Sequence, residues 1–141
     1  MSKEVSRTIT ACCSESGAAL KVSFDVTEIT TEMRTRLEKR LSRKGIAVRW
    51  TEQATGSELL IRFVEVNQGN RFLRYMLPFI APAFLEVEGQ IALAGSSPQQ
   101  LHYVQRAQIG LFGGSAKVML KSCAQRVANK IASDVLRSLK S

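Results

Sequence analysis

The sequence predicts an α+β fold, in which two amphipathic helices pack on one face of a mixed, mostly antiparallel sheet. Several short runs alternate apolar and polar residues, as half-buried strands do, and two longer runs repeat apolar residues every three or four positions, as helices do. Their order is two strands, a helix, four strands and a helix. Because 141 residues is the usual size of one domain, we expect residues 1–141 to form a single α+β domain.

The first 45 residues are expected to form two strands and a helix. Apolar side chains alternate weakly over residues 5–11 and clearly over residues 20–26. Thr27 is a suitable N-cap for a helix over about residues 27–44, and Gly45 can end that helix in the left-handed conformation. The apolar residues that share one face of this helix are Ile29, Met33, Leu37 and Leu41.

Two strands are expected in the middle of the chain. Residues 46–50 form a short strand, and the crossover rule favours a parallel arrangement with a strand that precedes the helix. Residues 59–66 carry apolar side chains on both faces, which indicates a central strand. In this strand Leu59, Ile61 and Phe63 share one face, and Leu60, Val64 and Val66 share the other.

The last third of the chain predicts an antiparallel hairpin followed by a helix. Residues 85–93 and 101–109 alternate, so that Arg106 is expected to face Glu86 or Glu88 across the hairpin. The segment 71–83, which contains two prolines, is expected to be an irregular connection. The last helix is expected from about Ser115, with one apolar stripe formed by Leu120, Ala124, Val127, Ile131, Val135 and Leu139.

Composition and charge narrow the possible partners. The formal net charge of +8 favours nucleic acid, an anionic membrane surface or an acidic protein as a partner, although a solvated helix face also explains it. No run approaches the length of a membrane span, and residues 1–8 contain no apolar stretch of the kind a signal peptide needs. We therefore expect a soluble chain as given. Three cysteines and one histidine suggest neither a disulfide framework nor a metal site, and no cofactor is expected.

The glycine-rich segment 108–115 is the first candidate binding site. A helix that starts at its end attracts anions, and Gly110, Gly113 and Gly114 let the backbone approach a ligand, with Ser115 and Lys117 nearby. The segment matches neither a P-loop nor a dinucleotide fingerprint. A tight strand-to-helix turn capped by Ser115 is the simpler interpretation, and both remain open.

Two groups of basic residues are further candidates. Arg71 and Arg74 lie among aromatic residues, an arrangement suited to phosphate or nucleic acid, but also to structural pairing. A basic face of the first helix can lie on nucleic acid or on an anionic bilayer, or can simply be solvated. This basic face consists of Arg36, Lys39, Arg40 and Arg43.

A catalytic group is not evident. His102 is the single histidine, and strand alternation points it outward, with nothing in the sequence that ties it to a cysteine. Cys123 is expected to be a small buried apolar residue. We therefore expect a protein that is not an enzyme.

Over about residues 58–139 the chain resembles an uncharacterised bacterial family, a domain-of-unknown-function group whose members are often small envelope lipoproteins. The resemblance rests on Gly69-Asn70 with Arg71 and Arg74, on the strand over residues 85–93, and on residues 110–115 running into an alanine-rich helix. It implies a location in the bacterial cell envelope if a signal was removed, and it carries no activity.

The sequence thus predicts a non-enzymatic binding or assembly module whose partner is a protein. In this hypothesis the contact surface consists of the segment 110–115 with Arg71 and Arg74. The alternative is a module that binds nucleic acid or another anion through the basic face of the first helix. The oligomeric state is not predicted.

Overall fold

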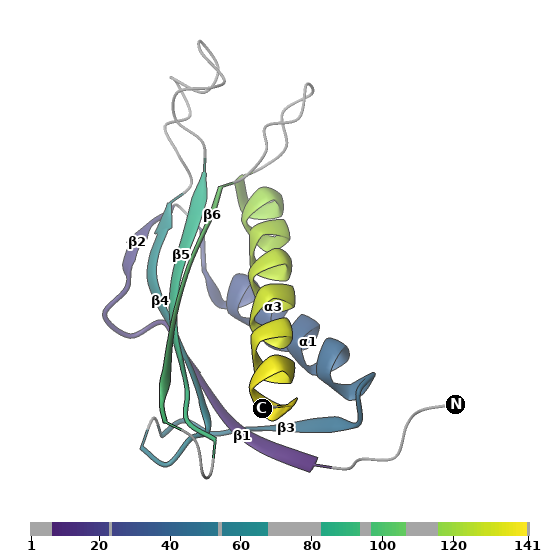
Figure 1. Cartoon of the computed structure of the whole chain (residues 1–141). Helices are drawn as coiled ribbons and strands as arrows, with labels where there is room; N and C mark the ends of the chain where they lie inside the picture. Colours follow the sequence, from purple (N-terminus) through teal and green to yellow (C-terminus); the bar gives the residue numbers. More distant parts are fainter. Residues whose placement is uncertain are drawn as a thin grey trace.

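The computed structural model describes residues 7–22, 24–53, 55–67, 83–93, 97–106 and 116–140. A sheet and two helices account for most of them (Figure 1). In chain order the elements are β1 (Arg7–Ser14), β2 (Ala19–Lys21), α1 (Thr27–Ser42), β3 (Ile46–Trp50), β4 (Leu59–Asn67), β5 (Phe84–Ile91), β6 (Gln99–Arg106) and α3 (Ala116–Lys140).

The sheet has the strand order β3-β1-β4-β5-β6, and β2 pairs with β4 beyond the end of β1. β1 runs parallel to β3 and to β4, whereas the two longest pairings, β4 with β5 and β5 with β6, are antiparallel. Both helices lie on the same face of the sheet, side by side (Figure 1). The predicted α+β fold is therefore confirmed, including the central position of β4.

The helices bury the predicted apolar stripes. Ile29, Met33, Leu37 and Leu41 of α1 are at most 1% exposed and pack in one core with the inward side chains of the sheet. On α3, small residues such as Ala128 and Ala132 are also fully or almost fully buried, which permits a close approach of the helix to its neighbours. Burial of these stripes is the main favourable contribution to the stability of the fold.

The start of α1 differs from the prediction. The N-cap is Val26, whose side chain cannot accept a hydrogen bond, and Thr27 is already the first helical residue. Asp25 Oδ1 accepts hydrogen bonds from the Thr27 backbone N–H at 2.9 Å and from Thr27 Oγ1 at 2.7 Å, so the carboxylate stabilises the start of the helix. The strand expected over residues 20–26 is reduced to Ala19–Lys21. The end of α1 matches the prediction, since Gly45 has a φ of 79°.

A bulge in β4 changes the predicted face of one residue. The register between β4 and β5 shifts between Phe63 and Glu65, so one extra residue is inserted in β4. As a consequence Val66 lies in the core at 1% exposure, on the face of Phe63. Strict alternation over residues 59–66 had predicted the opposite face for Val66.

The predicted partner of Arg106 is also wrong. Arg106 lies opposite Phe84, and Glu86 Oε2 instead lies 2.6 Å from His102 Nε2. The inward face of β5 is as predicted, with Leu85, Val87 and Ile91 buried. Gly89 shares that face, where a Cβ would lie 3.3 Å from the Leu60 carbonyl oxygen, so a larger residue there would press on β4.

We expect Leu37→Ala to lower the free energy of unfolding by about 2–5 kcal/mol, because it removes a fully buried side chain from the core shared by helix and sheet. Thr35→Ala, at an exposed position on the same helix, is the matched control and should change it by less than about 0.5 kcal/mol. Urea denaturation of both variants measures the difference. Equal losses in the two variants would contradict the assigned face of α1.

Candidate functional site

Most of the first candidate site lies outside the described residues. Arg71, Arg74, Gly110, Gly113, Gly114 and Ser115 are not described, and Lys117 lies in the first turn of α3 with no description of its side chain. The residues that flank the two segments are neighbours, since Asn67 pairs with Phe84 and Phe84 pairs with Arg106. Asn67, Phe84 and Arg106 therefore lie at the same end of the sheet, and the role of the two segments in binding stays a prediction.

The basic face predicted on α1 lies toward the outside of the helical layer. Lys39, Arg40 and Arg43 are exposed, and Arg36 is half-buried. These four residues follow Glu32, the α1 residue whose carboxylate accepts a hydrogen bond from the Gln125 side chain of α3. The two helices are therefore in contact just before the basic half of α1.

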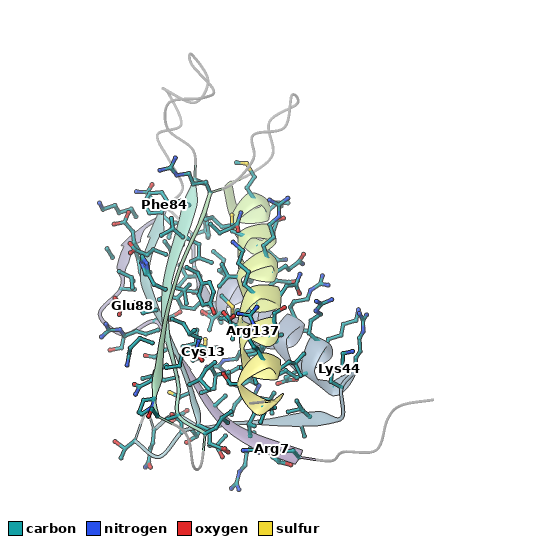
Figure 2. The ribbon with its side chains drawn as sticks, in the orientation of Figure 1. Arg7, Cys13, Lys44, Phe84, Glu88 and Arg137 are labelled. Carbon is teal, nitrogen blue, oxygen red and sulfur yellow. The ribbon has the colours of Figure 1, made fainter. Side chains whose placement is uncertain are left out.

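The second helix carries exposed basic residues as well. Arg126, Lys130 and Arg137 are exposed on α3. We call the combined set the basic helical surface, and it consists of Arg36, Lys39 and Arg40 of α1, Arg43 at the C-cap of α1, and Arg126, Lys130 and Arg137 of α3. Figure 2 shows Lys44, the residue after Arg43, and Arg137 on the helix side of the sheet, away from Glu88.

Few carboxylates neutralise the basic helical surface. Arg137 Nη1 lies 3.5 Å from Asp134 Oδ1, and Lys130 Nζ donates to the neutral Gln105 Oε1 at 3.0 Å. The other five side chains form no ion pair with any residue that the structure describes. These charges are therefore free to attract an external anion.

On the opposite face of the sheet, several charged side chains lie close to a partner. Arg62 contacts Glu88, His102 contacts Glu86, and Lys21 Nζ lies 3.6 Å from Glu65 Oε1. Glu65 and Glu86 are direct cross-strand neighbours, an unfavourable pair of like charges. Because each has a cationic or histidine partner, the repulsion between them is reduced.

The thiols are buried, and burial disfavours the thiolate form that a nucleophile requires. All three cysteines are free and buried. Burial raises the pKa of the Cys13 thiol from 9.0 to about 11, although the nearby Arg34 guanidinium lowers it in part. Burial likewise raises the pKa of Cys123, with a partial lowering by Arg126. Both thiols are protonated at neutral pH, and His102 lies on the face of the sheet away from the core that contains Cys13.

The residues that the structure describes contain neither a metal site nor a membrane-spanning helix. They hold no group of three or more His, Cys, Asp and Glu side chains arranged to bind a metal ion. Neither described helix is long and apolar enough to cross a membrane.

Comparison with known families gives a match to the family model "Domain of unknown function (DUF4410)", over residues 14–122. The chain belongs to this family. The match includes α1, every strand from β2 to β6 and the first turns of α3. It confirms the resemblance to a domain-of-unknown-function family. No curated protein sequence matches the chain.

Comparison with solved structures gives matches at low sequence identity. A protein of the DUF330 family from Xanthomonas campestris matches with a TM-score of 0.50 and 6% identity, over 97% of this chain and 88% of that one. The PelC dodecamer from Paraburkholderia phytofirmans gives a TM-score of 0.45 and 11% identity over 84% and 83% of the two chains. A candidate lipoprotein from Caulobacter crescentus gives 0.40 and 12% over 94% and 90%. At 6% identity the match to the DUF330 protein shows the fold alone and assigns no activity.

We expect the free energy of unfolding to fall as the pH rises from about 9 to about 11. The unfolded chain loses the Cys13 proton near pH 9.0, whereas the folded protein keeps it to about pH 11, so unfolding is favoured between the two values. Tyr103 acts in the same direction at higher pH, because burial and its hydrogen bond to Asp134 raise its pKa. Urea denaturation at about pH 8 and about pH 10.5 measures the loss.

Cys13→Val is the matched control for this pH dependence, since it keeps a small apolar side chain and removes the titrating thiol. The Cys13 contribution reaches about 2–3 kcal/mol at full ionisation of the unfolded chain, and the variant should lose that part. An identical pH dependence in the variant and the parent protein would contradict the assignment to Cys13.

Proposed function

We propose that this protein is a non-enzymatic binding module that docks a polyanionic partner on its basic helical surface. The observation that carries the proposal is the segregation of charge between the helices and the rest of the chain. Residues 27–44 and 116–140 contain twelve of the 20 Lys and Arg residues and only four of the 12 Asp and Glu residues. The whole net charge of +8 therefore belongs to the two helical segments, and the remainder of the chain is neutral.

Stabilisation of the helices accounts for only part of this pattern. Glu28 in the first turn of α1 and Lys39 and Arg40 in its last turn complement the helix dipole. The first turn of α3 contains no acidic residue, and Arg126 lies well before its last turn. Arg126 and Lys130 therefore lie too far from the end of α3 to complement its dipole, whereas Arg137 lies in the last turn. A role in binding accounts for the exposed basic residues that precede the last turn of α3.

The chemistry of the surface favours recognition by charge. Neither α1 nor α3 contains an aromatic residue, so neither offers a platform on which unpaired bases can stack. Among the exposed large apolar side chains of the described residues, Val118 is the one on a helix, so insertion into a bilayer gains little. Arginine predominates among the seven basic residues and can bind phosphate or carboxylate groups through paired hydrogen bonds.

The absence of catalysis is part of the proposal. Support comes from the protonated state of Cys13 and Cys123 at neutral pH and from the separation of His102 from the core. The contact surface hypothesised at Arg71, Arg74 and the segment 110–115 stays a separate prediction. A protein partner and a location in the cell envelope also remain predictions, since the fold is compatible with them and does not require them.

The test replaces four exposed members of the basic helical surface in one variant: Lys39→Gln, Arg40→Gln, Arg43→Gln and Arg126→Gln. Binding of a short duplex DNA is measured as a function of salt concentration. Each lost phosphate contact reduces the slope of log K against log salt by about 0.9, so the variant should lose a slope of about 3 to 4. Anionic vesicles and poly-glutamate, used in parallel, identify which polyanion binds most tightly.

The control removes the same number of charges from the rest of the molecule: Arg7→Gln, Lys21→Gln, Arg49→Gln and Arg106→Gln. This control variant has the same net charge as the helical one, so a difference between them reports position and not total charge. It should retain most of the slope. Equal losses in the two variants, or no binding of the parent protein to any of the three polyanions, would overturn the proposal.

A further inference from the structure

A crevice opens beside the second half of β1, on a part of the molecule that the basic helical surface does not include. β3 pairs only with residues 7–11 of β1 and ends at Trp50, which lies beside Ala11. On the other side of β1, β4 begins at Leu59, which also lies beside Ala11. No described strand therefore pairs with Cys13 on the β3 side. Cys13 lies between the sheet and the helices (Figure 2), and the crevice beside it has a volume of about 430 Å³.

Eight of the nine residues that line the crevice are polar, although carbon atoms contribute more of its exposed surface than nitrogen and oxygen atoms do. Its position, at the carboxyl ends of two parallel strands and beside the first turns of a helix, is where α/β proteins bind ligands. Cys13 and Thr30 are buried, and Ser16, Thr27, Thr31 and Glu52 are exposed around it. The lining residues are Cys13, Ser14, Glu15, Ser16, Thr27, Thr30, Thr31, Arg34 and Glu52.

Arg34 is the cation of the crevice, and most of its hydrogen-bonding capacity is unused. Its Nη2 donates to the Cys13 carbonyl oxygen at 3.0 Å, and its guanidinium lies 5.3 Å from the centre of the Trp50 ring. Its Nε is enclosed and has no partner, and no described carboxylate lies within ion-pair distance. A guanidinium has five N–H donors, so the group is equipped to bind an anionic ligand at modest further desolvation cost.

Two carboxylates give the crevice its negative charge. Glu15 Oε2 accepts a hydrogen bond from Thr30 Oγ1 at 2.9 Å, which holds that carboxylate at the wall of the crevice. Glu52 is exposed and forms no ion pair within the described part of the chain. With Arg34, the lining carries one positive and two negative charges. A ligand that balances all three has one anionic group and two cationic groups.

We propose that this crevice binds a free basic amino acid, with its carboxylate on Arg34 and its two cationic groups toward Glu15 and Glu52. Hydroxyl groups of Ser14, Ser16, Thr27 and Thr31 supply further donors and acceptors. The volume lies in the range of small-molecule sites, roughly 300–1,000 Å³. The site is independent of the basic helical surface, so either assignment can fail without the other.

L-lysine is the probe, and Trp50 provides the signal. Trp50 is the single tryptophan of the chain, and the guanidinium that receives the ligand carboxylate lies over its ring. Lysine should therefore produce a saturable change in tryptophan emission. Cadaverine, which lacks the carboxylate, 6-aminohexanoate, which lacks the α-ammonium, and L-alanine, which lacks the side-chain cation, should each bind at least about tenfold more weakly.

Variants assign the binding to the crevice, with calorimetry as the readout because it does not depend on Trp50. Arg34→Gln should weaken lysine binding about 10- to 100-fold through loss of the charge-assisted hydrogen bonds. Arg36→Gln is the matched control on the same helix and should leave lysine affinity within about twofold. Glu52→Gln, at an exposed position, tests the cationic groups if Arg34→Gln fails to fold, and should weaken lysine more than alanine.

Three results would each overturn the proposal. The first is no change in emission and no heat with lysine up to about 10 mM. The second is equal affinity for lysine and cadaverine, which would mean that Arg34 receives no carboxylate. The third is any variant result that places binding outside the crevice. Such a result is either an equal loss of lysine affinity in Arg36→Gln and Arg34→Gln, or an unchanged lysine affinity in Glu52→Gln.

Discussion

The shared burial of two apolar helix stripes is the constraint on which the rest of this structure depends. α1 and α3 lie on one face of the sheet and contact each other, so Met33, Leu37, Val127 and Ile131 belong to one core. Each helix has one apolar stripe, and the core uses both. The polar sides of the helices therefore face outward, and each of them carries exposed basic residues.

The register of β1 imposes a second constraint. β3 pairs with the first half of β1 and β4 with the second half, on opposite sides of β1. The loop from β3 to β4 therefore crosses β1. Thr51 N donates to Ala11 O and Glu58 N donates to Thr10 O at this crossing. Beyond Ala11 the backbone of β1 has no described strand on the β3 side. A side chain, Arg34, donates to the Cys13 carbonyl instead. The same guanidinium that donates to the Cys13 carbonyl at the edge of β1 thus also lines the crevice.

Local sequence patterns were sufficient for much of the fold. The stripe on α1, the glycine that ends it and the inward face of β5 follow from periodicity and turn chemistry, which depend on neighbouring residues alone. The errors arise where tertiary structure decides. The face of Val66 depends on a bulge set by pairing with β5, and the partner of Arg106 depends on the register of β5 and β6.

The candidate surfaces were less predictable for the same reason. The basic face of α1 was evident from its sequence, but its continuation onto Arg126 and Lys130 required knowledge that the helices are adjacent. The crevice combines Glu15, Arg34 and Glu52 from three separate elements, and no spacing in the sequence relates them. Local sequence patterns carry no information about such groups of residues, because strand order and register bring the groups together.

The two surfaces can coexist on one helix because their charges are separated along it. Glu28 and Glu32 lie in the first half of α1, and Arg36, Lys39, Arg40 and Arg43 follow toward its end. A helix of 16 residues is about 24 Å long, two to three times the Debye length of about 8–10 Å near physiological ionic strength. The positive potential of Lys39, Arg40 and Arg43 is therefore largely screened at Thr27, whereas Arg36 is only about 7.5 Å along the helix from Thr31, within one Debye length. Local carboxylates such as Glu15 and Glu52 then determine which ligands the crevice attracts, whereas the basic end of α1 acts with α3 on a larger anionic partner.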